Sequence, residues 1–145
     1  MNDDRVRFHV YDVTMREGAP PRVARLAELL QTSEDEVIAA LRRLFAAHML
    51  VLQPDADEIL MAGPFSAVPT PFRVTLDAFT CYANCIWDAL GIAANLRADA
   101  DIDTSCADCG TATRVRVRSH ELLDRDGFMH FALPPRAWWQ DIVFT

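Results

Sequence analysis

The chain has 145 residues, 51% of them apolar, and a net charge of −7, so it can form a packed core but is too acidic to favour nucleic-acid phosphates. No apolar run is long enough to span a bilayer, and the acidic start at Met1–Arg5 does not resemble a signal peptide. We therefore predict a cytoplasmic protein with no membrane partner, in which the four cysteines are reactive or metal-binding rather than disulfide-bonded.

The first 66 residues predict three helices followed by a hairpin. Apolar residues recur at helical spacing over 5–16, which predicts the first helix. Pro20-Pro21 begin a second helix with one apolar face, and a Ser33/Glu36 capping box begins the third. Short strands are predicted at 49–52 and 59–61. This is the winged-helix order, so we predict a winged-helix-like domain over 1–66. The side chains expected to face its core are Val6, Val10, Tyr11, Val13, Val23, Leu26, Leu29, Leu30, Val37, Ile38, Leu41, Leu44 and Phe45.

Winged helices often bind DNA, but the charges of this segment argue against it. The third helix offers only Arg42 and Arg43, and it begins with the acidic run 34–36. Asp55 and Asp57 occupy the hairpin turn, where a DNA-binding wing would be basic. We expect a structural or protein-contacting role for this domain and no nucleic-acid partner.

The second half predicts a separate α+β domain. Breaker residues around 67–71 indicate a linker, and 72–145 would form a small mixed α/β core. Its predicted elements are strands at 72–76, 102–106, 113–118 and 128–133, a helix over 80–96 and a short helical turn at 120–124. Apolar and charged residues alternate along the strand at 113–118, which predicts one solvated face made of Arg114, Arg116 and Arg118.

Cys85 and Asp88 are the most chemically informative pair in the sequence. If a helix starts here with Asn84 as its cap, Cys85 lies in the first turn, where the helix dipole favours a thiolate, and Asp88 shares its face. Because a carboxylate opposes a neighbouring thiolate, at least one of the two groups should hold a proton. By spacing alone, the pair also fits an inert buried cysteine beside an ordinary helix aspartate.

The four cysteines together also fit a structural zinc site in a non-catalytic binding module or regulator. Cys106-Ala-Asp-Cys109-Gly110 is typical of half of a zinc knuckle. The other half, Cys81 and Cys85, has three intervening residues and falls within a predicted helix, which is less usual. Both a reactive thiol site and a zinc site made by all four cysteines stay open at this level.

The segment Tyr82-Ala83-Asn84-Cys85-Ile86-Trp87-Asp88-Ala89-Leu90 resembles the tyrosine-alanine-x-cysteine-x-x-aspartate-x-leucine segment of organomercurial (alkylmercury) lyases. Cys106 stands where that family has a further cysteine, and 69–74 resembles the family's junction between its winged-helix-like domain and its core. The resemblance implies protonolysis of carbon–mercury bonds, with Cys85 as thiolate ligand and Asp88 as proton donor. Further candidate mercury ligands are Cys81, Cys106 and Cys109.

The same resemblance implies the partners of the site. No cofactor would be required, because Hg(II) is the metal of the substrate and product, whereas zinc belongs to the alternative interpretation. The partners would be a small organometallic or thiol-reactive substrate and small thiols that remove the product. Trp138-Trp139 could line a pocket for the organic group or pack in the core. The histidines, which show no paired metal spacing, are His9, His48, His120 and His130.

One feature of the family is missing from the sequence. The family has a second catalytic cysteine, which by alignment would fall just beyond Thr145, so we expect the chain to be incomplete there. Two alternatives stay open. One of Cys81, Cys106 and Cys109 replaces the missing ligand, or the protein is a non-catalytic relative that binds a metal or a thiol-reactive compound.

Overall fold

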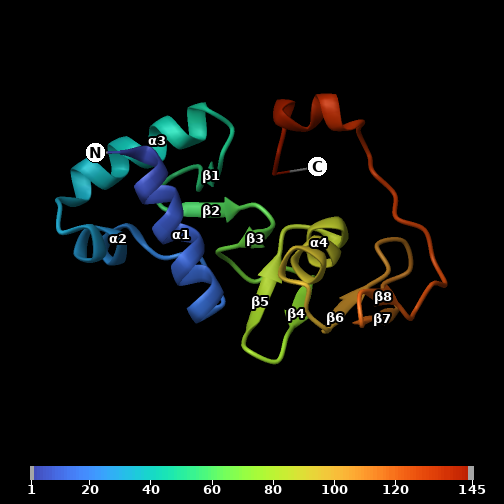
Figure 1. The fold of residues 1–145 in the computed structure, drawn as a ribbon. Helices are drawn as coiled ribbons and strands as arrows, with labels where there is room; N and C mark the ends of the chain where they lie inside the picture. Colours follow the sequence, from blue (N-terminus) through green and yellow to red (C-terminus); the bar gives the residue numbers. More distant parts are fainter. Residues whose placement is uncertain (1, 144–145) are drawn as a thin grey trace.

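The computed structural model describes residues 2–143. Three helices pack together at one end of the molecule, a twisted antiparallel sheet crosses its middle, and a fourth helix lies against the sheet (Figure 1). None of the helices in residues 2–143 is long and apolar enough to cross a membrane. The helices are α1 (Asp3–Glu17), α2 (Val23–Leu30), α3 (Glu34–Ala46), α4 (Ile86–Leu96) and the 3₁₀ helix η1 (Pro135–Gln140). The strands are β1 (Val51–Leu52), β2 (Ile59–Ala62), β3 (Phe65–Ser66), β4 (Arg73–Thr75), β5 (Thr80–Ala83), β6 (Ala100–Ser105), β7 (Ala112–Arg118) and β8 (Glu121–Leu122).

The three predicted N-terminal helices are confirmed, and their ends follow from local capping. The Asn2 side chain accepts a hydrogen bond from the Asp4 N–H at the start of α1. Ser33 Oγ accepts from the Glu36 N–H at the start of α3, as the capping box predicts. The Glu36 carboxylate, however, accepts from the Thr32 hydroxyl, so the second half of the predicted box takes a different form.

The apolar faces of these helices form the first of two cores. Val6, Leu26 and Leu41 are fully buried, and each of these helices contributes to the same cluster together with β2. The expected inward orientation of Phe45 is wrong, because 42% of this side chain is exposed.

Arg42 and Arg43 of α3 are both paired with acids. Arg42 donates two hydrogen bonds to Asp57 in the β1–β2 turn, at 2.8 and 2.9 Å, and Arg43 pairs with Asp3 at 2.6 Å. These pairs neutralise the two cations that α3 would offer to a phosphate backbone. The expected absence of a nucleic-acid partner stays a prediction.

The strands form one continuous antiparallel sheet in the order β1-β2-β3-β5-β4-β6-β7-β8. The predicted β1–β2 hairpin is confirmed, and β3, which pairs with both β2 and β5, joins it to the rest of the sheet. The α+β class is therefore confirmed. The winged-helix-like domain at 1–66, the linker at 67–71 and the domain at 72–145 stay predictions.

The predicted helix over 80–96 is wrong in its first part. Thr80–Ala83 form β5, which pairs with β4 in the register Val74 to Cys81, and the helix begins only at Ile86. Cys81 and Ala83 face inward while Thr80 is exposed, an alternation that suits a strand. Strand pairing at the centre of the sheet therefore outweighs the helical spacing of the sequence.

Two further predicted elements are wrong. The helical turn expected at 120–124 is instead β8, because Ser119 and His120 both take positive φ values, of 50° and 67°, and turn the chain into a hairpin with β7. Residues 128–133 form no strand and lead irregularly into η1. The strands expected at 72–76, 102–106 and 113–118 correspond to β4, β6 and β7.

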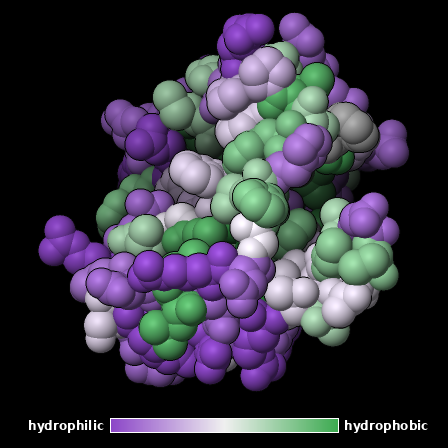
Figure 2. All heavy atoms as spheres, turned by 90° about the vertical axis from the view of Figure 1, so that its right-hand side faces the viewer, coloured by the Kyte–Doolittle hydropathy of each residue, from purple (hydrophilic) through white to green (hydrophobic). Residues whose placement is uncertain are grey.

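The face of the molecule around β7 is polar, as the sequence predicts. Figure 2 shows hydrophilic side chains over the lower part of this face. The Arg side chains of β7 form ion pairs with acids of β6 and of the segment after β8, and these pairs are Arg114–Asp103, Arg118–Asp101 and Arg116–Asp124. On the other face, Val117 is buried with α4 and the central strands in the second core.

Gly18 sets a close approach between the helical part and the sheet. It ends α1 with φ of +79°, and a Cβ at this position would lie 2.2 Å from the Thr80 carbonyl oxygen at the start of β5. We expect Gly18→Ala to lower the free energy of unfolding by about 2–5 kcal/mol, from left-handed strain and steric overlap combined. Urea denaturation measures this change.

Gly91→Ala is the matched control for this substitution. Gly91 lies inside α4 with nothing within 4 Å of an added Cβ, so the alanine is expected to raise stability by up to about 1 kcal/mol. Equal effects of the two substitutions would show that the Gly18–Thr80 contact does not constrain the fold.

Candidate functional site

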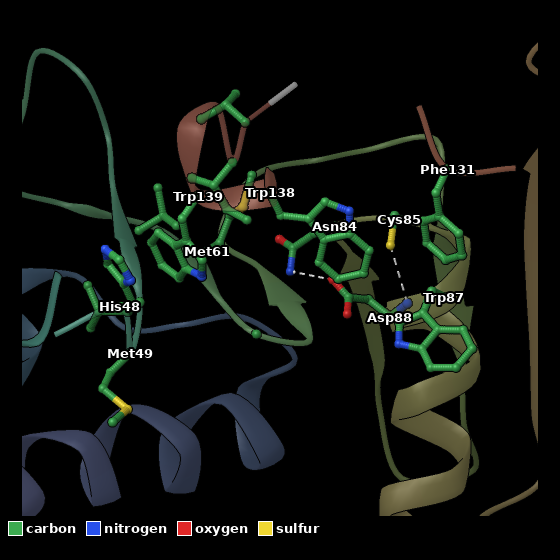
Figure 3. A pocket seen from close by; sticks show the side chains of 15 residues that line it. His48, Met49, Met61, Asn84, Cys85, Trp87, Asp88, Phe131, Trp138 and Trp139 are labelled. Atoms are coloured by element: carbon green, nitrogen blue, oxygen red, sulfur yellow. Dashed lines mark hydrogen bonds between the residues drawn. The ribbon is translucent and has the colours of Figure 1, made fainter. Parts of the chain in front are cut away.

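A pocket of about 340 Å³ opens between the start of α4, the first hairpin and the C-terminal segment around η1 (Figure 3). Most of its lining is apolar or aromatic, and only a few polar groups face into it. The lining residues are His48, Met49, Leu50, Val51, Met61, Gly63, Asn84, Cys85, Trp87, Asp88, Phe131, Trp138, Trp139, Ile142 and Val143. An apolar pocket with a few convergent polar groups is the usual form of a small-molecule site.

Cys85 is the N-cap of α4. Its backbone is extended, and its Sγ accepts a hydrogen bond from the Asp88 N–H at 3.4 Å. The expected cap at Asn84 is therefore wrong, because the thiol itself occupies the capping position. The expected thiolate is also not favoured in the free protein, because burial raises the pKa of Cys85 more than the helix N–H groups lower it.

Asp88 is half-buried in the first turn of the helix, beside the thiol. Burial raises the pKa of this carboxyl above its usual value, while hydrogen bonds from Asn84 and Cys85 partly oppose the shift. Both Asp88 and Cys85 thus favour their protonated forms more than free groups do. This agrees with the expectation that two such neighbours do not both ionise.

Asn84 is a site residue that sequence reasoning treated only as a helix cap. Its Nδ2 donates to Asp88 Oδ2 at 2.9 Å, so the amide points at the carboxyl from the end of β5 (Figure 3). Its Oδ1 is buried, and no hydrogen-bond partner for it lies within the described part of the chain. The spacing of four residues between Asn84 and Asp88 is the sequence signal that could have indicated this contact.

Aromatic side chains from the C-terminal segment close the pocket. Phe131 packs edge-on against Trp87, with ring centroids 6.1 Å apart, and lies 5.4 Å from Trp138. On the other side, Trp139 stacks on His48 at 4.1 Å. Of the two roles considered for Trp138 and Trp139, the structure supports the pocket lining. The contributions of His48 and Phe131 come from tertiary packing that the sequence pattern does not reveal.

The other three cysteines lie outside this pocket. Cys81 is buried in the second core, and burial raises its pKa to about 11. Cys106 and Cys109 are exposed around the turn between β6 and β7. Within residues 2–143, no three His, Cys, Asp or Glu side chains are grouped to hold a metal, so the predicted four-cysteine zinc site is not assembled. The strand at 80–83 causes this separation, because it turns Cys81 into the core.

Comparison with known families supports the resemblance seen in the sequence. The family model described as MerB, alkylmercury lyase, matches residues 65–145, more than half of the chain, including the pocket residues from Asn84 onward. The chain belongs to the alkylmercury lyase family. The family match confirms the resemblance inferred from the segment around Cys85. The search of curated proteins found no match to the chain.

Among solved structures, this alkylmercury lyase family member is similar to the mercury-bound form of MerB2, with a TM-score of 0.64 and 24% sequence identity. The match covers 84% of this chain and 58% of the other, so the chain spans little more than half the length of that relative. At this identity the likeness shows a shared fold. The shared fold extends beyond residues 65–145, since the covered fraction exceeds that range alone.

Proposed function

We propose that this alkylmercury lyase family member cleaves carbon–mercury bonds by protonolysis, with Cys85 holding the mercury and Asp88 supplying the proton. The observation that carries the proposal is the contact between Cys85 Sγ and the Asp88 N–H inside an apolar pocket. This contact fixes a soft ligand and a proton carrier on one helical turn. A reacting atom held by the thiol would lie within reach of the carboxyl.

In the first step, Cys85 exchanges its proton for mercury. Hg(II) is soft and prefers sulfur, so an S–Hg bond replaces the S–H bond and the proton leaves with the displaced ligand or to solvent. The raised pKa of Cys85 does not prevent this exchange, because the metal displaces the proton. Two helix N–H groups, from Trp87 and Asp88, favour the negative sulfur that is formed.

In the second step, Asp88 transfers its proton to the carbon bound to mercury. The C–H bond forms as the C–Hg bond breaks, leaving a hydrocarbon, a carboxylate and a cationic mercury on sulfur. The raised pKa of Asp88 favours its protonated form, which is the form that donates the proton. The Asn84 amide then donates to the new carboxylate. A small thiol from solution then binds the mercury and gives its proton to the carboxylate. A second thiol displaces Cys85, which takes that thiol's proton as the mercury dithiolate leaves.

The aromatic lining suits the organic part of the substrate. Trp87, Phe131 and Trp138 present ring surfaces close to the thiol and carboxyl. These surfaces limit the access of water to the carbon–mercury bond, which protects the carbon from competing reactions. The mercury ligand, the proton and the binding surface come from protein side chains, and the only other reactant is a small thiol, so the proposed mechanism requires no cofactor.

The proposal is tested by incubating the protein with an organomercurial and an excess of a small thiol, and measuring the hydrocarbon released. We expect catalytic release, several turnovers per chain, above a control that contains the thiol alone. Release that does not exceed this control would reject the lyase activity.

Asn84 is expected to position Asp88 and to set the pH range of the reaction. Because its amide hydrogen bond lowers the pKa of Asp88, Asn84→Ala should raise that pKa further. The acid then stays protonated to higher pH, so the alkaline decline of hydrocarbon release moves upward by about 1–2 pH units, the equivalent of one hydrogen bond to a charged group. The pH–rate profile measures this shift.

Thr104→Val is the matched control, because Thr104 also carries a buried polar atom with no hydrogen-bond partner among the described residues but lies outside the pocket. Its pH–rate profile is expected to match that of the unaltered protein. An unchanged profile in Asn84→Ala, with the fold intact, would reject the positioning role of Asn84.

A further inference from the structure

The turn between β6 and β7 carries a pair of exposed thiols that the proposed lyase reaction does not use. The turn is closed by two backbone hydrogen bonds of 2.9 Å, from the Cys106 N–H to the Thr111 carbonyl and from the Gly110 N–H to the Cys106 carbonyl. Gly110 takes a φ of +71°, which lets the chain turn directly after Cys109. This backbone therefore holds Cys106 and Cys109 on one compact turn.

The two thiols of this turn interact with each other and with Thr111. The Cys109 Sγ lies 3.1 Å from Thr111 Oγ1, and the Cys106 side chain also interacts with the Cys109 thiol. These contacts lower the pKa of Cys109, in contrast to Cys81 and Cys85, whose pKa values are raised. Both cysteines of the turn are exposed and free, so they are accessible to reagents in solution.

The number of ligands in the turn decides which metals it can hold. Within the described part of the chain, no third His, Cys, Asp or Glu completes a cluster with the two sulfurs. Structural zinc requires four protein ligands, which the turn does not provide. Soft ions such as Hg(II) form stable complexes with only two thiolates, and the exposed side chains are free to adjust to the nearly linear S–Hg–S geometry.

We propose that Cys106 and Cys109 form a second soft-metal site, separate from the Cys85 pocket, which binds one Hg(II) as a dithiolate. Two S–H bonds break, two S–Hg bonds form, and two protons pass to solvent. Because the two sulfurs belong to one turn, the second bond forms at a high effective concentration. The pair therefore competes with monothiols better than a single cysteine does. The site lies outside the pocket lining, so its binding does not depend on the lyase reaction.

The test uses the Cys85→Ser protein, which lacks the pocket thiol, and inorganic mercuric chloride as the probe. After incubation with a monothiol in about millimolar excess and removal of small molecules, we expect one Hg(II) per chain to remain. Cys85→Ser/Cys106→Ser and Cys85→Ser/Cys109→Ser are each expected to lose it, whereas Cys85→Ser/Cys81→Ala is expected to keep it. A zinc salt under the same conditions should leave no bound metal.

Alkylation of the Cys85→Ser protein gives a second readout that needs no further variant. Bound Hg(II) is expected to protect Cys106 and Cys109 together from iodoacetamide, as located by peptide mass analysis. Retention of Hg(II) in both turn variants, or protection of only one of the two cysteines, would overturn the proposal. Because Cys85 is absent throughout, the result is separate from the presence or absence of hydrocarbon release.

Discussion

Cys85→Ser is expected to reduce hydrocarbon release from an organomercurial to the level of the thiol-only control. A serine hydroxyl is a hard ligand that does not hold Hg(II), so the substrate is no longer fixed beside Asp88. Serine is also a favourable N-cap, and Cys85 is the N-cap of α4, so the helix start should remain intact. The loss would therefore be chemical rather than structural. Measuring hydrocarbon release and the thermal unfolding midpoint on the same sample distinguishes a loss of chemistry from a loss of structure.

Cys81→Ala is the matched cysteine control for this experiment. Cys81 lies only four residues earlier but is buried in the second core, outside the pocket. Its replacement should cost stability while leaving hydrocarbon release measurable at low temperature. Release that survives in Cys85→Ser, or that disappears equally in a folded Cys81→Ala protein, would contradict the assignment of Cys85 as mercury ligand.

Asp88→Asn is expected to slow hydrocarbon release by about 10²–10⁴-fold, the range for removal of a general acid. The amide is close in size to the carboxyl, and the Asp88 N–H that contacts Cys85 Sγ belongs to the backbone and is retained. Mercury binding at Cys85 should therefore persist while proton transfer to carbon fails. Single-turnover release, together with the mercury content of the protein, distinguishes the two steps.

Asp77→Asn serves as the control for Asp88→Asn, because Asp77 is exposed between β4 and β5 and lies outside the pocket. Its rate should equal that of the unaltered protein. If Asp88→Asn releases hydrocarbon at an undiminished rate, the proton comes from another donor. If it loses mercury binding as well, the role of Asp88 lies in ligand binding rather than in proton transfer.

The parts of the fold that the sequence predicted correctly are those specified by local signals. Ser33, for example, begins α3 through its own hydroxyl, as the capping box in the sequence predicts. β5 and β8 were missed because their conformation depends on pairing with strands elsewhere in the chain. The short apolar run at 80–83 fits a helix or a strand equally well until its neighbours are known.

The candidate site was predictable to the extent that its motif is contiguous. Cys85 and Asp88 lie three residues apart, so their contact follows from helix geometry. The aromatic wall depends on the position of the C-terminal segment relative to α4, which no local pattern encodes. The clustering of the four cysteines in the sequence was misleading, because it does not show which of them lie together in the folded protein. Strand β5 and the β6–β7 turn place Cys81, Cys85 and the Cys106–Cys109 pair in three different environments.

Single-turnover hydrocarbon release in heavy water tests the central claim most directly. If mercury is held on Cys85 and the proton comes from the exchangeable acid of Asp88, the unaltered protein should release hydrocarbon with one deuterium at the carbon that carried mercury. Asp88→Asn should form this product about 10²–10⁴-fold more slowly, and Cys85→Ser should not form it above background. Hydrocarbon without deuterium, or equal rates of labelled release in all three proteins, would contradict the account.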